Sequence, residues 1–164
     1  MPVEIERKFL VVSDAWRAEA TRHDLFRQGY LGGGEFCSTR VRVGAGRAWL
    51  TLKGRVRGAR RLEFEYPIPV ADANEILDAL CAGGRVEKRR HWVPYAGHEW
   101  EVDEFLGANS GLVLAELELD DEGMEFAAPP WLGREVTEDV RYYNSHLASH
   151  PWPTWRRDAE TQAE

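Results

Sequence analysis

Apolar and polar residues alternate with a period of two along most of the chain, which is the pattern of half-buried β-strands. In residues 3–11, Ile5 and Phe9 lie on one face while Glu4 and Glu6 lie on the other. The same alternation predicts strands at 37–43, 48–53, 62–66, 88–92, 100–103 and 113–119, and a weaker signal predicts one near 25–31. The chain is therefore expected to be α+β, mainly antiparallel β.

Turns and helices separate these strands. Residues 44–46 and 97–98 are glycine-containing and predict tight turns between neighbouring strands, and a short helix is weakly indicated at 13–16. Asp72 and Glu75 resemble a capping box for a helix over 72–82. Two further signals concern helix ends: Gly83 and Gly84 would end that helix, and Thr137 would cap a last helix with Val140, Tyr143 and Leu147 on one side.

Length and composition bound the possibilities. The 164 residues fit one domain, expected over residues 1–150, followed by a polar and frayed C-terminal tail at 151–164. A net charge of −7 argues against a general nucleic-acid binder, and two cysteines provide no disulfide framework or zinc cluster. The sequence shows no membrane-spanning run and no signal-peptide pattern, so the expected location is cytoplasmic.

The polar faces of the predicted strands carry charges that are sorted by sign. Any single polar face can be ordinary solvated surface, because antiparallel sheets often expose one face to water. A solvated surface, however, has no reason to give each strand one sign, since mixed charges serve solubility better. The same-sign pairs at spacing two are Glu4 and Glu6, Arg40 and Arg42, Glu63 and Glu65, Lys88 and Arg90, Glu101 and Asp103, and Glu116 and Glu118.

These faces make physical sense on the inside of a closed barrel, with the apolar faces outside and covered by helices. With Lys8 and Lys53, the interior would hold eight acids and six bases, a sum of −2. Burying so many charges without ligands would exceed the stability of a domain. Carboxylates suit Mg²⁺ or Mn²⁺, whereas arginine and lysine suit phosphate oxygens. The pattern therefore indicates a site for divalent metal and a compact phosphate compound.

A family resemblance supports this interpretation. Residues 4–8 read Glu-Ile-Glu-Arg-Lys, an E-x-E-x-K signature, and later segments match in order over almost the whole chain. They are Arg40-x-Arg42, the 50–54 segment Leu-Thr-Leu-Lys-Gly, Glu63-x-Glu65, Lys88-x-Arg90, Asp103 before Phe105, and Ala115-Glu116-Leu117-Glu118. The chain resembles the CYTH superfamily, also called the triphosphate tunnel metalloenzymes.

The resemblance implies a closed eight-stranded antiparallel barrel, with a few covering helices, whose tunnel binds a triphosphate and two divalent ions, Mg²⁺ or Mn²⁺. It assigns a first metal to Glu4, Glu6, Glu116 and Glu118. It assigns a second metal, or the positioning of water, to Glu63, Glu65 and Asp103, which with Lys88 are the expected catalytic residues. It assigns the phosphates to Lys8, Arg40, Arg42, Lys53, Lys88 and Arg90. Glu101 has the right parity but no family role.

The function expected from the resemblance is metal-dependent hydrolysis of inorganic triphosphate. Residues 4–11, Gly29-Tyr30-Leu31 and residues 133–144 look most like the short bacterial inorganic triphosphatases. Two enzymatic alternatives stay open: an adenylate cyclase of class IV type, and a hydrolase of nucleoside or thiamine triphosphate. A non-catalytic sensor is a third. The expected partner is a small-molecule triphosphate, with no nucleic acid or membrane, in a monomer or homodimer.

One basic run stands apart from the tunnel pattern. Arg55, Arg57, Arg60 and Arg61 follow one another between two predicted strands. A solvated loop is the favoured interpretation. The alternative is a mobile lid that attracts an anion by long-range electrostatics.

Overall fold

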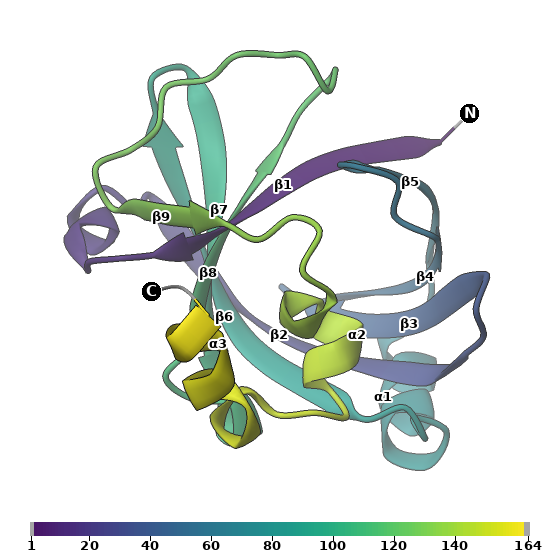
Figure 1. The fold of residues 1–164 in the computed structure, drawn as a ribbon. Helices are drawn as coiled ribbons and strands as arrows, with labels where there is room; N and C mark the ends of the chain where they lie inside the picture. Colours follow the sequence, from purple (N-terminus) through teal and green to yellow (C-terminus); the bar gives the residue numbers. More distant parts are fainter. Residues whose placement is uncertain (1, 163–164) are drawn as a thin grey trace.

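The computed structural model describes residues 2–162 and shows an antiparallel sheet closed into a barrel (Figure 1). The strands are β1 (Val3–Val11), β2 (Arg22–Gly33), β3 (Cys37–Gly44), β4 (Arg47–Gly54), β5 (Arg60–Pro67), β6 (Arg85–Tyr95), β7 (His98–Leu106), β8 (Val113–Glu118) and β9 (Leu132–Glu135). They are ordered β5-β4-β3-β2-β6-β7-β8-β1, and a pairing of β1 with β5 closes the ring. The predicted fold class and eight-stranded barrel are confirmed, and β9 is an extra strand paired with β1.

Strand β1 is the closing strand of the barrel. It pairs along one edge with β8, where Glu6 lies opposite Glu118 and Lys8 opposite Glu116. Its first residues pair with β5, beginning with Val3, and its last residues pair with β9. The E-x-E-x-K segment is thereby held from both sides, and Glu4, Glu6 and Lys8 all line the interior of the barrel.

Apolar clusters pack on both faces of the barrel wall. The largest surrounds Trp100 of β7, which is fully buried in a cluster with Phe9, Trp16 and Trp131. Full burial of one large apolar side chain contributes roughly 1.5–3 kcal/mol. A second cluster gathers Val86, Phe105, Leu112, Leu114, Val136, Tyr142 and Leu147. The strand residues of this second cluster share the inner face with Lys88 and Glu116, so apolar side chains fill part of the barrel interior beside the charged groups.

Helices cover outer faces of the barrel and one opening. They are α1 (Val70–Ala79), α2 (Asn144–Leu147), α3 (Arg156–Gln162) and the 3-10 helices η1 (Ala15–Ala18), η2 (Gly107–Asn109), η3 (Val140–Tyr142) and η4 (Trp152–Thr154). Ala73 and Leu77 of α1 pack on Val41 and Ala48 of the barrel wall. In Figure 1, α2 and the chain before it lie across an opening of the barrel rather than along its outer side. Within residues 2–162, no helix has the length and apolarity that crossing a membrane requires.

The capping-box prediction for the first helix is wrong. The helix begins two residues earlier, at Val70, and its N-cap is Pro69 rather than Asp72, which lies in the first turn. Pro69 has φ −60° and ψ 137°, and no side-chain hydrogen bond from the described residues caps this helix. The helix also ends at Ala79, before the predicted glycines. Gly84 has φ +93° and precedes β6, and an added Cβ would lie 2.2 Å from the carbonyl oxygen of Ala148.

The prediction of a last helix capped by Thr137 is also wrong. The Thr137 hydroxyl accepts a bond from the Lys8 backbone N–H (3.0 Å) and donates to Glu135 Oε2 (2.6 Å), so it serves strand pairing instead. The chain forms only the single turn of η3, capped by Asp139, and then leaves helical geometry at Tyr143 before α2. The backbone N–H of Lys8 in β1 thus bonds to the Thr137 hydroxyl, which a longer helix would use as its N-cap.

Smaller differences concern the ends of the chain and the weak signals. The weak strand is longer than predicted and spans Arg22–Gly33, and the short helix at 13–16 is the 3-10 helix Ala15–Ala18. Strand β9 was not predicted. The segment expected to fray forms η4 and α3, and both Trp152 and Trp155 pack against the second apolar cluster.

Candidate active site

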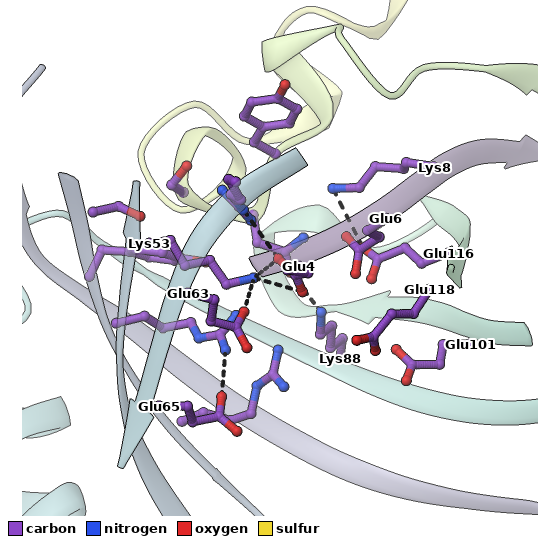
Figure 2. Close-up of a pocket in the computed structure, with 18 of the residues that line it drawn as sticks. Glu4, Glu6, Lys8, Lys53, Glu63, Glu65, Lys88, Glu101, Glu116 and Glu118 are labelled. Atoms are coloured by element: carbon purple, nitrogen blue, oxygen red, sulfur yellow. Dashed lines mark hydrogen bonds and ion pairs between the residues drawn. The ribbon is translucent and has the colours of Figure 1, made fainter. Parts of the chain in front are cut away.

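A cavity of about 230 Å³ occupies the barrel interior, and its wall is almost entirely polar (Figure 2). It is formed where the inward faces of the strands converge, because side chains two apart on a strand share one face. The predicted residues that line it are Glu4, Glu6, Lys8, Arg40, Arg42, Lys53, Glu63, Glu65, Lys88, Arg90, Glu101, Glu116 and Glu118. The lining also includes Tyr30, Ser38, Arg61, Tyr143, Asn144 and Ser145.

Carboxylates gather on one side of this cavity. Glu6, Glu101, Glu116 and Glu118 come from β1, β7 and β8 and lie near one another in Figure 2. Burial, together with the charges of Glu116 and Glu4, raises the pKa of Glu6 well above its usual value. Burial and neighbouring carboxylates likewise raise the pKa of Glu118 and of Glu101. Burial opposes ionisation of Glu116, but Lys8 and Arg90 outweigh it and lower the pKa of that carboxyl, so this side of the cavity combines crowded carboxylates with cations.

The donor set fits a divalent metal ion, because carboxylate oxygens are the hard ligands that Mg²⁺ and Mn²⁺ take. Within the part of the chain that the structure describes, no three His, Cys, Asp or Glu side chains are already arranged around one metal position. The reason is ion pairing: Glu116 contacts Lys8 (3.5 Å) and Arg90 (3.2 Å), while Glu101 contacts Arg90 (2.6 Å). Binding a metal requires these carboxylates to turn from the cations toward the ion.

The other side of the cavity carries cations and carboxylates in contact with one another. Lys53 Nζ lies 3.0 Å from carboxylate oxygens of both Glu4 and Glu63. Arg40 Nη2 lies 3.6 Å from Glu65. Arg42 Nε donates instead to the amide oxygen of Gln28 (3.0 Å).

Arg42 stands in a surplus of positive charge. Burial and the neighbouring Arg40 and Arg90 lower the pKa of Arg42 to about 10. The guanidinium therefore gains when an anion enters and supplies negative charge. A phosphate group would supply that negative charge, and its oxygens suit the planar guanidinium of an arginine.

Asp103 is fully buried beside the cavity and is not among the residues that line it. Its side chain has no exposed surface and is held by Arg90 through two bonds of 2.8 Å and by Lys88 at 2.7 Å. Burial opposes ionisation of Asp103, but Arg90 and Lys88 outweigh it and lower the pKa of the carboxyl. In this arrangement the Asp103 carboxylate contacts two cations, Lys88 and Arg90.

Lys88 is the most enclosed cation that lines the cavity within residues 2–162, with 1% of its surface exposed. Burial lowers its pKa to about 7, against the opposing effect of Asp103 and with the help of Arg90. Its ammonium group also donates to the side-chain oxygen of Asn144 (2.8 Å).

Arg61 is a site residue that the sequence interpretation missed. The pattern places it in the basic loop, but β5 begins at Arg60, so Arg61 shares its face with Glu63 and Glu65. Its Nε lies 3.3 Å from Glu4 Oε2. The signal was present as a continuation of the spacing of two, and the run of neighbouring arginines obscured it.

The residues from 143 to 145 were also missed as site residues. Tyr143, Asn144 and Ser145 enter the cavity wall because the chain breaks its helical geometry at Tyr143 and turns into α2 across the barrel opening. A continuous helix capped by Thr137 would not give this arrangement. Tyr30, whose position at the tunnel the sequence did not show, lines the same cavity from β2.

Fold and site together define a class of protein: a closed antiparallel barrel whose tunnel is lined both by carboxylates, which suit divalent cations, and by lysine and arginine side chains, which suit phosphate oxygens. A model of the CYTH domain matches residues 2–149, and the chain belongs to the CYTH family. The resemblance inferred from the sequence is confirmed.

Relatives and solved structures agree. An inorganic triphosphatase of Acetivibrio thermocellus is 49% identical over 156 residues, covering 95% of this chain and 99% of the relative. One of Nitrosomonas europaea is 40% identical over 150 residues, covering 88% and 96%. A crystal structure of an inorganic triphosphatase superposes with a TM-score of 0.65 at 36% identity, covering 90% of this chain and 95% of that one.

Proposed function

We propose that this protein is a metal-dependent inorganic triphosphatase, which hydrolyses tripolyphosphate to pyrophosphate and orthophosphate. The observation that carries the proposal is the small cavity whose wall combines carboxylates with lysine and arginine side chains. Its volume of about 230 Å³ is below the roughly 300–1,000 Å³ typical of sites for drug-sized ligands, which favours a compact polyanion. The names of the relatives point to the same substrate.

The residue roles follow the chemistry of the side chains that line the cavity. Divalent ions, Mg²⁺ or Mn²⁺ and in our proposal two of them, would activate water and neutralise phosphate charge when bound. The proposed ligands are Glu4, Glu6, Glu63, Glu116 and Glu118, with Glu65 near the reacting water. The proposed phosphate-binding residues are Lys8, Arg40, Arg42, Lys53, Lys88 and Arg90, joined by Arg61. Asp103 becomes the residue that orients Lys88 and Arg90.

The chain's own contribution to the reaction is positioning and charge. Phosphoryl transfer passes through a transition state whose charge is spread over the phosphoryl oxygens, so catalysis rests on cations fixed at those oxygens. Lys88 and Arg90 are fixed by Asp103 before substrate arrives. Arg42 is fixed through Gln28. These groups need little rearrangement as the phosphorus–oxygen bond breaks.

The direct test is phosphate release from tripolyphosphate and from ATP, each with Mg²⁺, with Mn²⁺ and with a chelator. We expect fast release from tripolyphosphate with either metal, slower release from ATP, and none in chelator. Absence of release from tripolyphosphate under every metal condition would contradict the proposed function.

Arg61→Ala is expected to raise the KM for tripolyphosphate about tenfold, because a charge-assisted hydrogen bond to an anion is lost. Arg60→Ala is the matched control, since Arg60 is the adjacent residue of β5 and is exposed on the other face. Steady-state kinetics on the two variants measures the difference. Equal KM values would show that Arg61 only neutralises Glu4.

A nucleotide substrate is the second candidate, favoured by one observation. A wider hollow of about 580 Å³ adjoins the cavity and shares Ser38, Lys53 and Arg61 with it. Phe36 and Tyr143 also line this hollow and offer aromatic surface for a nucleoside. Analysis of the products from ATP separates the possibilities: cyclic AMP and pyrophosphate indicate a cyclase, and ADP and phosphate indicate a hydrolase.

The remaining assignments are proposals of the same kind. Cys37 and Cys81 are both free thiols. This supports the proposed cytoplasmic location, because the cytoplasm keeps thiols reduced. The proposed catalytic domain spans residues 1–150. A monomer and a homodimer are both compatible with the barrel, and analytical ultracentrifugation distinguishes them.

A further inference from the structure

The side-chain oxygen of Asn144 contacts two neighbouring strands of the barrel wall. It accepts one hydrogen bond from Lys88 Nζ (2.8 Å) and another from Gln28 Nε2 (3.0 Å). Lys88 belongs to β6 and Gln28 to β2, whereas Asn144 begins α2. One amide oxygen thus links the segment across the barrel opening to both strands.

Gln28 passes this contact on to Arg42. Its side chain has no exposed surface, and its oxygen accepts a bond from Arg42 Nε (3.0 Å). Its amide nitrogen donates both to Asn144 and to the hydroxyl of Tyr30 (3.0 Å). A glutamine amide turned by 180° would present N–H groups to the Arg42 donor. The acceptor on Asn144 therefore fixes the orientation of Gln28 in which its oxygen faces Arg42.

Lys88 is restrained from two directions. Its ammonium group contacts Asp103 at 2.7 Å and Asn144, which lines the cavity, at 2.8 Å. With Asp103 alone, the flexible lysine side chain would have a single partner that draws it away from the cavity. Asn144 supplies the second point that defines the position of the ammonium group.

The segment that carries Asn144 is itself anchored from behind. Leu147 is fully buried in the second apolar cluster, and its carbonyl accepts a bond from Asn109 Nδ2 (3.2 Å). The side-chain oxygen of Asn109 accepts a bond from the backbone N–H of Trp152 (2.9 Å). Lys8 Nζ donates to the carbonyl of Tyr142 (3.3 Å). The segment around Asn144 is consequently held in place, so the Asn144 side chain can position other groups.

We propose that Asn144 is a positioning residue for triphosphate hydrolysis, which orients Lys88 directly and Arg42 through Gln28. The proposal rests on the proposed function, because the two cations are taken to face substrate phosphates. Its physical basis is preorganisation: a cation held at the site of developing charge stabilises the transition state without reorganising during the reaction. Loss of the Asn144 side chain is therefore expected to change kcat more than KM.

The test compares Asn144→Ala and Asn144→Asp with Ser149→Ala, an exposed residue just after α2. Asn144→Ala is expected to lower kcat for tripolyphosphate by about 10- to 100-fold, the range seen when supporting groups around a site are removed. Asn144→Asp keeps the acceptor for both bonds, so kcat is expected to recover to within a few-fold of the natural protein. The added negative charge is expected to raise KM. Ser149→Ala should match the natural protein.

A double substitution tests the route through Gln28. If Asn144 acts through it, Gln28→Ala combined with Asn144→Ala lowers kcat by clearly less than the product of the two single effects. Multiplicative effects would overturn the route through Gln28. A kcat for Asn144→Ala equal to that of the natural protein would overturn the proposal, as would an Asn144→Asp variant as slow as Asn144→Ala.

A crystal structure of Asn144→Ala provides a readout that needs no turnover. We expect a displaced Lys88 ammonium group or a turned Gln28 amide, and unchanged positions of both would overturn the positioning role. If the natural protein failed to hydrolyse tripolyphosphate, the proposed function would fall, and this structural comparison would still decide whether Asn144 sets the two cations.

Discussion

Glu6→Gln is expected to reduce metal-dependent hydrolysis by at least about 100-fold and, at the same time, to make the metal-free protein more stable. The loss of activity follows from removing a proposed metal ligand. The gain in stability follows from the crowding of carboxylates, because burial and the charges of Glu116 and Glu4 raise the pKa of Glu6 well above the usual value. A neutral side chain of the same size removes that repulsion.

The sign of the pH dependence is fixed by that raised pKa. Below a pH of about 4.3 the Glu6 carboxyl is protonated in both the folded and the unfolded chain, so the natural protein and the Glu6→Gln variant should melt alike with respect to this group. As the pH rises, ionised Glu6 increasingly destabilises the folded state, and the advantage of Glu6→Gln grows. A gain of about 1 kcal/mol corresponds to roughly 2–4 °C in Tm for a chain of this size.

Thermal melting at a pH of about 8, in chelator and in Mn²⁺, measures both effects. Metal should raise the Tm of the natural protein more than that of Glu6→Gln, because a ligand stabilises the state that binds it. Glu87→Gln is the control, since Glu87 is exposed on β6. A lower Tm for Glu6→Gln in chelator would contradict the idea that neighbouring carboxylates destabilise ionised Glu6.

Asp103→Ala is expected to have the opposite effect on stability, a loss of about 3–5 kcal/mol in the free energy of unfolding. Truncation leaves Lys88 and Arg90 buried without the carboxylate that both contact. The corresponding fall in Tm is roughly 6–20 °C. Asp103→Asn keeps the shape but not the charge, and we expect it to fall between the natural protein and Asp103→Ala.

The pH dependence again has a definite sign. The pKa of Asp103 is lowered in the folded protein, so its stabilising contribution is present above the unfolded value of about 3.9 and is lost as the pH falls through the folded value. Urea unfolding of the natural protein and Asp103→Asn in chelator, near neutral pH and again below about pH 3.9, tests this. If Asp103→Asn unfolded like the natural protein but lost the response to metal, Asp103 would be a metal ligand as the sequence suggested.

The contrast between Glu6 and Asp103 shows what strand periodicity reveals about a site. Parity correctly placed both side chains on the inner face of the barrel, and the sorting of charges by strand predicted the closed tunnel. Strand periodicity tells which face a side chain is on, but not how deeply the side chain is buried within that face. Asp103 lies opposite Arg90 in the register of β6 and β7, and its bonds to Arg90 hold it away from the cavity lining.

Arg61 and Asn144 were missed for different physical reasons. The position of Arg61 depended on where β5 begins. The sequence marks the start of this strand poorly, because the residues before it are also basic. The position of Asn144 depended on a tertiary competition: Thr137 bonds to the backbone of β1 and to Glu135 instead of capping a helix. No local pattern reports that competition, so the segment across the opening became visible only in the folded chain.

The role of β1 as the closing strand has a consequence for how the chain folds. Its partners lie far away in sequence: β5 begins at Arg60 and β8 at Val113. Such distant pairings are slow to form, because the ordering of the intervening chain must precede them. During synthesis β1 emerges before every other strand, yet it has no partner on its β8 edge until most of the chain exists. Ring closure is therefore a late step of folding, and the tunnel becomes competent to bind only then.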